Sequence, residues 1–134
     1  MTYSNLKNKV MQDKLSSIFD ELGVFFAFSN KQFAEGKQKR NIKENEKIAS
    51  IHGGGFLPSK NAKAYIKKTN DLVVWLEKQV KKLNPEAVIG YELNNHECYY
   101  TGDISPAYEV LQAYDFTLDQ VRAVYHKNYS KQEL

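Results

Sequence analysis

One long amphipathic stretch decides the fold of this chain, residues Ser59–Leu83, SKNAKAYIKKTNDLVVWLEKQVKKL. Its apolar residues recur at steps of three, four and seven, which is typical of one face of an α-helix. They are Ala62, Ile66, Val73, Leu76, Val80 and Leu83. Pro85 cannot continue a helix, so the predicted helix ends near Leu83 and is on the order of 35 Å long. The rest of the chain is expected to pack around this central helix.

Before the central helix, the sequence predicts two helices (5–22 and 30–35) and two strands (24–28 and 48–52). Gly23 is placed to end the first helix in a left-handed turn. Ser29 and Gln32 have the spacing of a capping box, in which each side chain bonds the backbone N–H of the other residue. The polar stretch 37–47 has little to bury, so it is expected to form an exposed loop.

After Pro85 the sequence predicts a β-hairpin over 87–101, with a turn at Asn94-Asn95. Its register would place Glu92 directly opposite Glu97, on the less apolar face. Two further helices are predicted to start at Ser105-Pro106 and at the Thr117 to Gln120 capping box, followed by a frayed tail over 128–134. The predicted fold is therefore α+β: a small, mainly antiparallel sheet with helices packed on one side, in one globular domain over 1–134.

The composition is typical of a globular protein, because 42% of the residues are hydrophobic and 13% are aromatic. The single cysteine, Cys98, cannot form an internal disulfide, so a reducing cytoplasm is the expected location. No apolar run approaches the length of a membrane span, and no secretory signal is expected near the start of the sequence.

Charge is distributed unevenly along the chain. Residues 1–85 hold 16 basic and 8 acidic residues, a net +8, whereas residues 86–134 hold 3 and 8, a net −5. Three interpretations remain open: a solvated lysine-rich helix face, a surface for an anionic partner such as nucleic acid, and association of two copies through opposite charges. Arg40 and Arg122 are the only arginines, which weakens the nucleic-acid interpretation because arginine is favoured in base and phosphate recognition.

Acidic and histidine residues in the predicted hairpin are the first candidates for a site. Glu92 and Glu97 would repel each other unless a shared proton, a lysine or a divalent cation offset their charges. Alternatively, both side chains face solvent. In the Asn95-His96-Glu97-Cys98 run, histidine could supply acid–base chemistry or, with Cys98, bind zinc. In a strand, however, His96 and Glu97 point to opposite faces, and too few ligands lie nearby. We therefore predict no catalytic residue, no metal site and no cofactor.

The glycine-rich turn His52-Gly53-Gly54-Gly55, which precedes Lys60 at a helix start, is the second candidate site. Exposed backbone N–H groups and a helix N-terminus attract anions, so a phosphate or nucleotide could bind here. The turn lacks the glycine spacing of a P-loop or a dinucleotide-binding fold, and three glycines can also simply form a tight turn. Separately, nine tyrosines would suit a protein-binding surface.

Several motifs together carry a resemblance to a known group of proteins. They are Phe25-Phe-Ala-Phe-Ser29-Asn-Lys-Gln-Phe33-Ala-Glu-Gly36, Gly54-Gly55-Phe56-Leu57-Pro58, Asn94-Asn95-His96-Glu97 and Tyr100-Thr101-Gly102-Asp103. With these motifs, most of the chain resembles small uncharacterised proteins of bacteriophages and bacterial mobile elements. The resemblance brings no activity, cofactor or functional residue. It implies an intracellular accessory protein that acts on a host component or a signalling nucleotide, and a purpose for the Asn95-His96-Glu97 and glycine-rich turns.

Three functional hypotheses follow. The first is a non-enzymatic cytoplasmic module that binds a host or phage protein, favoured by the tyrosine content and the uneven charge. The second is the binding or hydrolysis of a nucleotide-like anion, at a site that combines the turn from His52 to Lys60 with Glu92, His96 and Glu97. The third is nucleic-acid binding through the lysine-rich face, which would weaken strongly with added salt.

Overall fold

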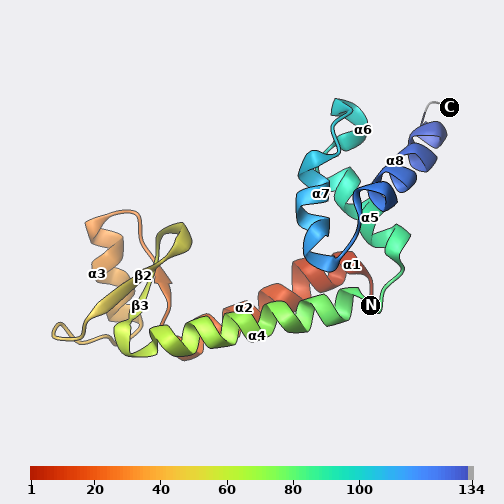
Figure 1. Cartoon of the computed structure of the whole chain (residues 1–134). Coiled ribbons are helices and arrows are strands. Elements are labelled where there is room, and N and C mark those ends of the chain that lie inside the picture. Colours follow the sequence, from red (N-terminus) through yellow and green to blue (C-terminus); the bar gives the residue numbers. More distant parts are fainter. Residues whose placement is uncertain (133–134) are drawn as a thin grey trace. The chain divides into compact units, whose positions relative to one another are not determined.

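The computed structural model describes residues 1–132, with side chains as far as Tyr129. These residues form two compact units. The sheet unit comprises residues 10–73, and the helical unit comprises residues 1–9 and those from 74 onward. The fold is α+β, as the sequence predicts, with one small antiparallel sheet among helices (Figure 1). The single domain predicted over 1–134 stays a prediction.

The sheet has three strands in the order β1-β3-β2: β1 (Phe25–Phe26), β2 (Ile48–Ile51) and β3 (Gly55–Pro58). The first two confirm the predicted strands, although β1 is shorter than expected. The third was not predicted, because its glycine and proline are both poor strand formers. A tight turn, His52–Gly54, joins β2 to β3.

Helices cover both faces of this sheet, so the prediction that they pack on one side only is wrong. On one face, Leu22, Val24 and Leu57 form a buried cluster against α2 (Met11–Leu22) and the start of α4 (Ala62–Val80). Gly23 ends α2 in the left-handed conformation that the sequence predicts, with φ of 74°. On the other face lies α3 (Asn30–Lys39), whose Phe33 ring packs against the Phe25 and Phe56 rings.

The long predicted helix is present as a short turn, Ser59–Asn61, followed by α4. Its predicted apolar stripe is wrong in part, since Ile66 and Val73 are 58% and 51% exposed. The buried face instead runs through Tyr65, which packs on the sheet core, and Leu72. Both sets of residues share helical spacing, so the periodicity of the sequence could not distinguish them.

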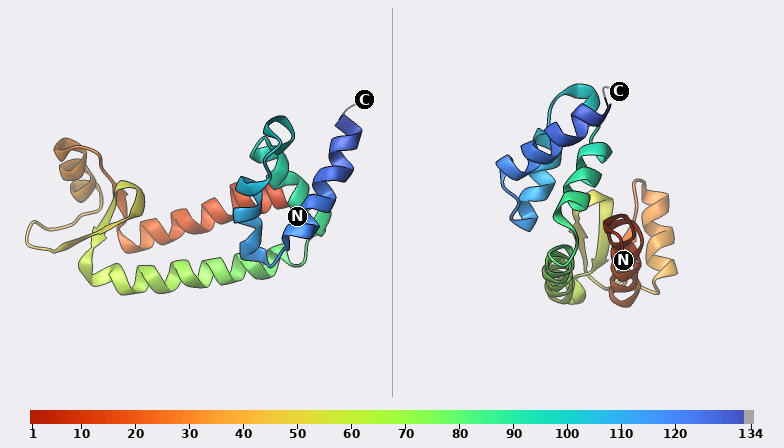
Figure 2. Two further views of the ribbon diagram at one scale, coloured as in Figure 1. Left: turned by 45° about the horizontal axis from the view of Figure 1, so that its top comes forward. Right: turned by 90° about the vertical axis from the view of Figure 1, so that its right-hand side faces the viewer.

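The helical unit contains α1 (Tyr3–Asn5), α5 (Pro85–Asn95), α6 (Cys98–Thr101), α7 (Ser105–Leu111), a short turn (Gln112–Tyr114) and α8 (Leu118–Gln132). A π-helical segment, Leu6–Val10, leads from α1 towards α2. Helix α5 packs against both α7 and α8 (Figure 2). The core consists of fully buried side chains from these elements and from the end of α4: Leu6, Val80, Val88, Leu93, Cys98, Leu111 and Val121.

The predicted hairpin over 87–101 is wrong, because these residues form α5, a turn and α6. The Asn84 side chain accepts hydrogen bonds from the backbone N–H groups of Glu86 and Ala87, and Pro85 occupies the first turn of the helix. Asparagine followed by proline is a helix-start signal. In the sequence it was interpreted only as the end of the preceding helix.

Two predicted irregular segments are more ordered than expected. Helix α3 continues through Lys39 and so takes up the first part of the predicted loop over 37–47. Helix α8 continues through Gln132, where a frayed tail over 128–134 was expected. Residues 133–134 lie outside the described residues. None of the helices in the described part of the chain has the length and apolar character needed to cross a bilayer.

Candidate functional site

The residues predicted to form a site are distributed over both units. The sheet unit holds His52, Gly53, Gly54, Gly55 and Lys60, and the helical unit holds Glu92, Asn95, His96 and Glu97. The combined anion site that these residues would form stays a prediction. Each group is therefore considered within its own unit.

Glu92 is the one fully buried charged residue of the described chain, with an exposed fraction of 0%. Three side chains surround its carboxylate: the Tyr3 hydroxyl donates to Oε1 at 3.1 Å, the Lys7 ammonium lies 2.5 Å from Oε1, and His96 Nε2 lies 3.2 Å from Oε2. The predicted opposition of Glu92 and Glu97 is wrong. Glu97 is exposed in the turn after α5, where its backbone is left-handed, with φ of 55°.

The side chains around Glu92 supply the hydrogen bonds and the positive charge that a buried carboxylate needs. Burial raises the pKa of the Tyr3 phenol far above its ordinary value, so this hydroxyl stays protonated and donates to the carboxylate. The Lys7 ammonium also lies 5.8 Å from the centres of the Tyr3 and Tyr91 rings. A ligand could reach the carboxylate only by displacing these side chains. We therefore interpret this cluster as the polar core of the helical unit.

Metal binding has no support from the described residues, which contain no group of three His, Cys, Asp or Glu side chains placed to hold an ion. Cys98 is fully buried, and burial raises the pKa of its thiol. A buried thiol with a raised pKa is a poor nucleophile, because the thiolate is the reactive form.

The glycine-rich turn of the sheet unit accommodates aromatic rings. Gly54 has φ of 79°, and a Cβ atom added there would lie 2.5 Å from the Phe28 ring. A Cβ atom at Gly55 would lie 2.6 Å from the Ile51 side chain and 3.0 Å from the Phe26 ring. The glycines therefore allow two phenylalanine rings to approach the backbone closely. His52 is exposed, and Lys60 lies 3.8 Å from the Glu46 carboxylate.

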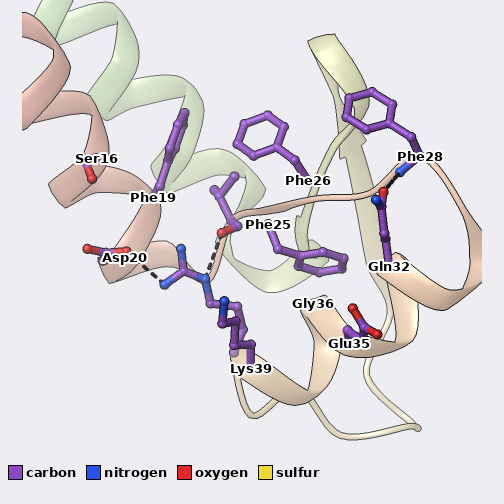
Figure 3. Close-up of a pocket in the computed structure, with 12 residues that line it drawn as sticks. Ser16, Phe19, Asp20, Phe25, Phe26, Phe28, Gln32, Glu35, Gly36 and Lys39 are labelled. Atoms are coloured by element: carbon purple, nitrogen blue, oxygen red, sulfur yellow. Dashed lines mark hydrogen bonds and ion pairs between the residues drawn. The ribbon is translucent and has the colours of Figure 1, made fainter.

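Both phenylalanine rings line a cavity of about 730 Å³ that is bounded by α2, β1 and α3 (Figure 3). The size is in the range of ordinary ligand pockets. We call this cavity the phenylalanine pocket. Its apolar wall is formed by Phe19, Phe25, Phe26 and Phe28, and its charged rim is formed by Asp20, Glu35, Lys39 and Arg40.

Part of the wall is held rigidly by packing. The Phe25 ring is stacked on Phe56, with ring centres 5.7 Å apart, and meets Phe33 edge-on at 5.5 Å. Gly36 lets α3 approach this ring, because a Cβ atom there would lie only 2.3 Å from it. By contrast, Phe26 and Phe28 are 45% and 79% exposed. The pocket thus combines a preformed wall with two rings whose exposed faces a ligand could contact.

The rim contains both paired and unpaired charges. The Arg40 Nε atom donates to the Val24 carbonyl at 2.8 Å, and its guanidinium lies 2.9 Å from the Asp20 carboxylate. Glu35 and Lys39 lie one turn apart on α3 and are exposed. Neither makes an ion pair with another residue of the described chain. Two opposite charges therefore remain available beside the apolar wall.

Sequence reasoning missed this pocket because the whole run over 24–28 was interpreted as a buried strand. In a strand, alternate side chains point to opposite faces, so Phe25 cannot share a face with Phe26. Phe25 is buried, and its neighbour on the chain is not. The alternation of a strand was therefore a usable signal that some of these rings face outward.

Comparison with known proteins gives a family. The model of a family of unknown function (DUF7659) matches residues 7–131. The chain belongs to this family. The matched region includes every residue of the phenylalanine pocket and Glu92, but it begins after Tyr3. No curated protein and no solved structure is significantly similar to the chain.

Proposed function

We propose that this protein is a non-enzymatic binding module, and that the phenylalanine pocket holds a segment of a partner protein. The observation that carries the proposal is the exposure of Phe26 and Phe28 beside a preformed apolar wall. Burying an exposed phenylalanine side chain contributes about 1.5–3 kcal/mol. Exposed aromatic groups around a pocket are typical of surfaces where a few side chains supply most of the binding energy.

The chemistry of the lining also favours binding over catalysis. The residues that line the pocket include one hydroxyl group, on Ser16, and two carboxylates, on Asp20 and Glu35, but no histidine or cysteine. The Arg40 guanidinium, which would be the group best suited to stabilise negative charge in a transition state, is already bound to Asp20 and a backbone carbonyl. The resemblance to phage and mobile-element proteins makes a host or phage protein in the cytoplasm the proposed partner.

Crosslinking from the pocket tests this proposal. A photoreactive phenylalanine analogue at position 28 is expected to capture a partner in cells of the native host. The same analogue at position 100 is the matched control, since Tyr100 is 91% exposed but belongs to the helical unit. Capture of the same protein with equal efficiency from both positions would contradict the proposal, and so would no capture from position 28.

The affinity of the purified partner supplies the quantitative prediction. We expect Phe28→Ser to weaken its Kd by about 10–100-fold, because the apolar area of one ring is lost from the interface. The mainly exposed ring contributes little to folding, so the circular dichroism spectrum should not change. Tyr100→Ser is expected to leave the Kd unchanged. Titration calorimetry of the two variants checks both expectations, and an unchanged Kd for Phe28→Ser would refute the proposal.

A further inference from the structure

We propose that the occupant of the phenylalanine pocket is an extended peptide segment that adds to the sheet at Phe26, with a basic, an apolar and an acidic residue in succession. This inference rests on the proposed function and names the chemistry of the partner. Three features of the sheet unit carry it: a free strand edge, the side chains beside that edge, and the unpaired charges on α3.

The free edge follows from the strand order and register. Strand β1 is at the edge of the sheet and is paired with β3 on one side only. The Ala27 N–H donates to the Gly54 carbonyl at 3.0 Å. In an antiparallel ladder, hydrogen-bonded and non-hydrogen-bonded pairs alternate. The neighbouring pair, Phe26 and Gly55, is therefore not hydrogen-bonded, and the N–H and C=O of Phe26 point away from β3.

Side chains already bind the backbone groups on either side of Phe26 at this edge. Arg40 donates to the Val24 carbonyl at 2.8 Å, and the Phe28 N–H donates to Gln32 Oε1 at 2.7 Å (Figure 3). No residue of the described chain bonds the N–H or C=O of Phe26. A gap one residue wide is thus left in an edge that is otherwise covered, and it is lined by pocket residues. Unpaired edge groups of this kind accept an added strand.

The apolar position of the peptide follows from side-chain alternation. A residue directly opposite Phe26 would exchange both backbone hydrogen bonds with it, and its side chain would lie on the same face of the sheet as the Phe26 ring. That ring meets Phe19 with ring centres 5.4 Å apart. The peptide residue opposite Phe26 would therefore pack against two aromatic rings, and a phenylalanine there matches them best.

The charged positions follow from the other face of the sheet. The peptide residues before and after the apolar one point towards the face of Phe25, which α3 covers. They lie about 7 Å apart in an extended chain. Glu35 and Lys39, at adjacent turns of α3, have Cβ atoms about 5–6 Å apart. A basic and an acidic residue that flank the apolar one would therefore complement these two unpaired charges.

The order of the two charges follows from the direction of α3. Gln32, near the start of α3, contacts the Phe28 end of β1, and Arg40, just after α3, contacts the Val24 end. Glu35 is therefore nearer to the Phe28 end. Lys39 is nearer to the Val24 end. An antiparallel peptide enters at the Phe28 end. The first of the two charged peptide residues therefore lies near Glu35 and should be basic. The last lies near Lys39 and should be acidic. The expected motif is Lys-Phe-Glu.

The probe is a synthetic pentapeptide, Ser-Lys-Phe-Glu-Ser, with an acetylated N-terminus and an amidated C-terminus. It is titrated into the isotope-labelled full chain, whose backbone amides are followed by NMR. We expect saturable shifts of the Phe26 amide and slower exchange of its hydrogen. N-methylation of the central phenylalanine removes one hydrogen-bond donor and is expected to weaken binding about tenfold. Equal binding of the N-methylated peptide would overturn the strand-edge inference and leave the proposed function of the pocket intact. Equal binding of N-acetylphenylalanine amide, or no response of the Phe26 amide, would also overturn it.

A charge exchange tests the motif. The double variant Glu35→Lys with Lys39→Glu is expected to prefer Ser-Glu-Phe-Lys-Ser over Ser-Lys-Phe-Glu-Ser, the reverse of the natural protein. The matched control exchanges Lys67 and Asp71, an exposed i,i+4 pair on α4 of the same unit, and should keep the natural preference. Equal preference in the natural protein and the Glu35/Lys39 variant would overturn the charge order. The partner captured from position 28 should contain the motif if both proposals hold.

Discussion

Replacing Glu92 with alanine is expected to lower the free energy of unfolding by about 3 kcal/mol. The substitution would remove the hydrogen bond from the buried Tyr3 hydroxyl to Glu92 and leave the Lys7 ammonium without its counter-ion. It would also open a cavity in the core of the helical unit. The Lys7 side chain is 33% exposed, so water can solvate part of its charge and limit the loss. Chemical denaturation followed by the fluorescence of Trp75 measures this change.

Two further substitutions define what the Glu92 carboxylate contributes. Glu92→Gln keeps the shape and one acceptor but removes the negative charge, so we expect a smaller loss of about 1–2 kcal/mol. Glu109→Ala on the exposed surface of α7 is the matched control and should change stability by less than about 0.5 kcal/mol. If Glu92→Ala were no more destabilising than Glu109→Ala, the carboxylate would not be part of the polar core.

Gly36→Ala is expected to destabilise the sheet unit by about 1–3 kcal/mol, although alanine is the better helix former. The added methyl group would lie 2.3 Å from the Phe25 ring. That ring cannot move aside, because it is buried between Phe33 and Phe56. The overlap therefore outweighs the gain of about 1 kcal/mol in helix propensity. Loss of the pocket wall should also reduce partner binding.

Gly90→Ala provides the opposite case in the helical unit. Gly90 lies within α5, and an added methyl group would meet its nearest neighbour, the Asn128 side chain, at an ordinary contact distance of 3.7 Å. We expect this variant to be more stable by about 0.5–1 kcal/mol, because only the helix propensity changes. Denaturation curves of the two glycine variants should therefore shift in opposite directions. A Gly36→Ala protein that is as stable as the natural protein, or more stable, would mean that the contact with Phe25 is not limiting.

The two proposals about the phenylalanine pocket require different contacts with the partner. Protein binding in general requires only that Phe28 become buried by the partner. The strand-edge inference requires in addition that the Phe26 backbone acquire hydrogen bonds. An experiment on the Phe28 side chain and one on the peptide backbone can therefore give different answers, and failure of the backbone experiment alone revises only the strand-edge inference.

The capping contacts at helix N-termini were the features most accurately predicted from the sequence. Thr117 and Gln120 form both hydrogen bonds of the predicted capping box. Ser29 accepts from the Gln32 N–H as predicted, although the Gln32 side chain bonds Phe28, one residue further back than expected. These contacts join residues within four positions of each other. Local sequence therefore contains everything that determines them.

The sequence by itself determined the α+β class, the central helix and the starts of α3, α7 and α8, because hydrogen bonds between near neighbours set these features. The tertiary structure decided which face of α4 is buried, that Glu92 lies in a core, and that Phe26 lies at an open edge. Tyr3 and Glu92 are 89 positions apart, and no local pattern shows that they meet. The apolar run over 87–93 fits a strand or a helix by periodicity alone. Its packing as α5 against α7 and α8 made it a helix, because only that conformation buries Val88, Ile89 and Leu93 together.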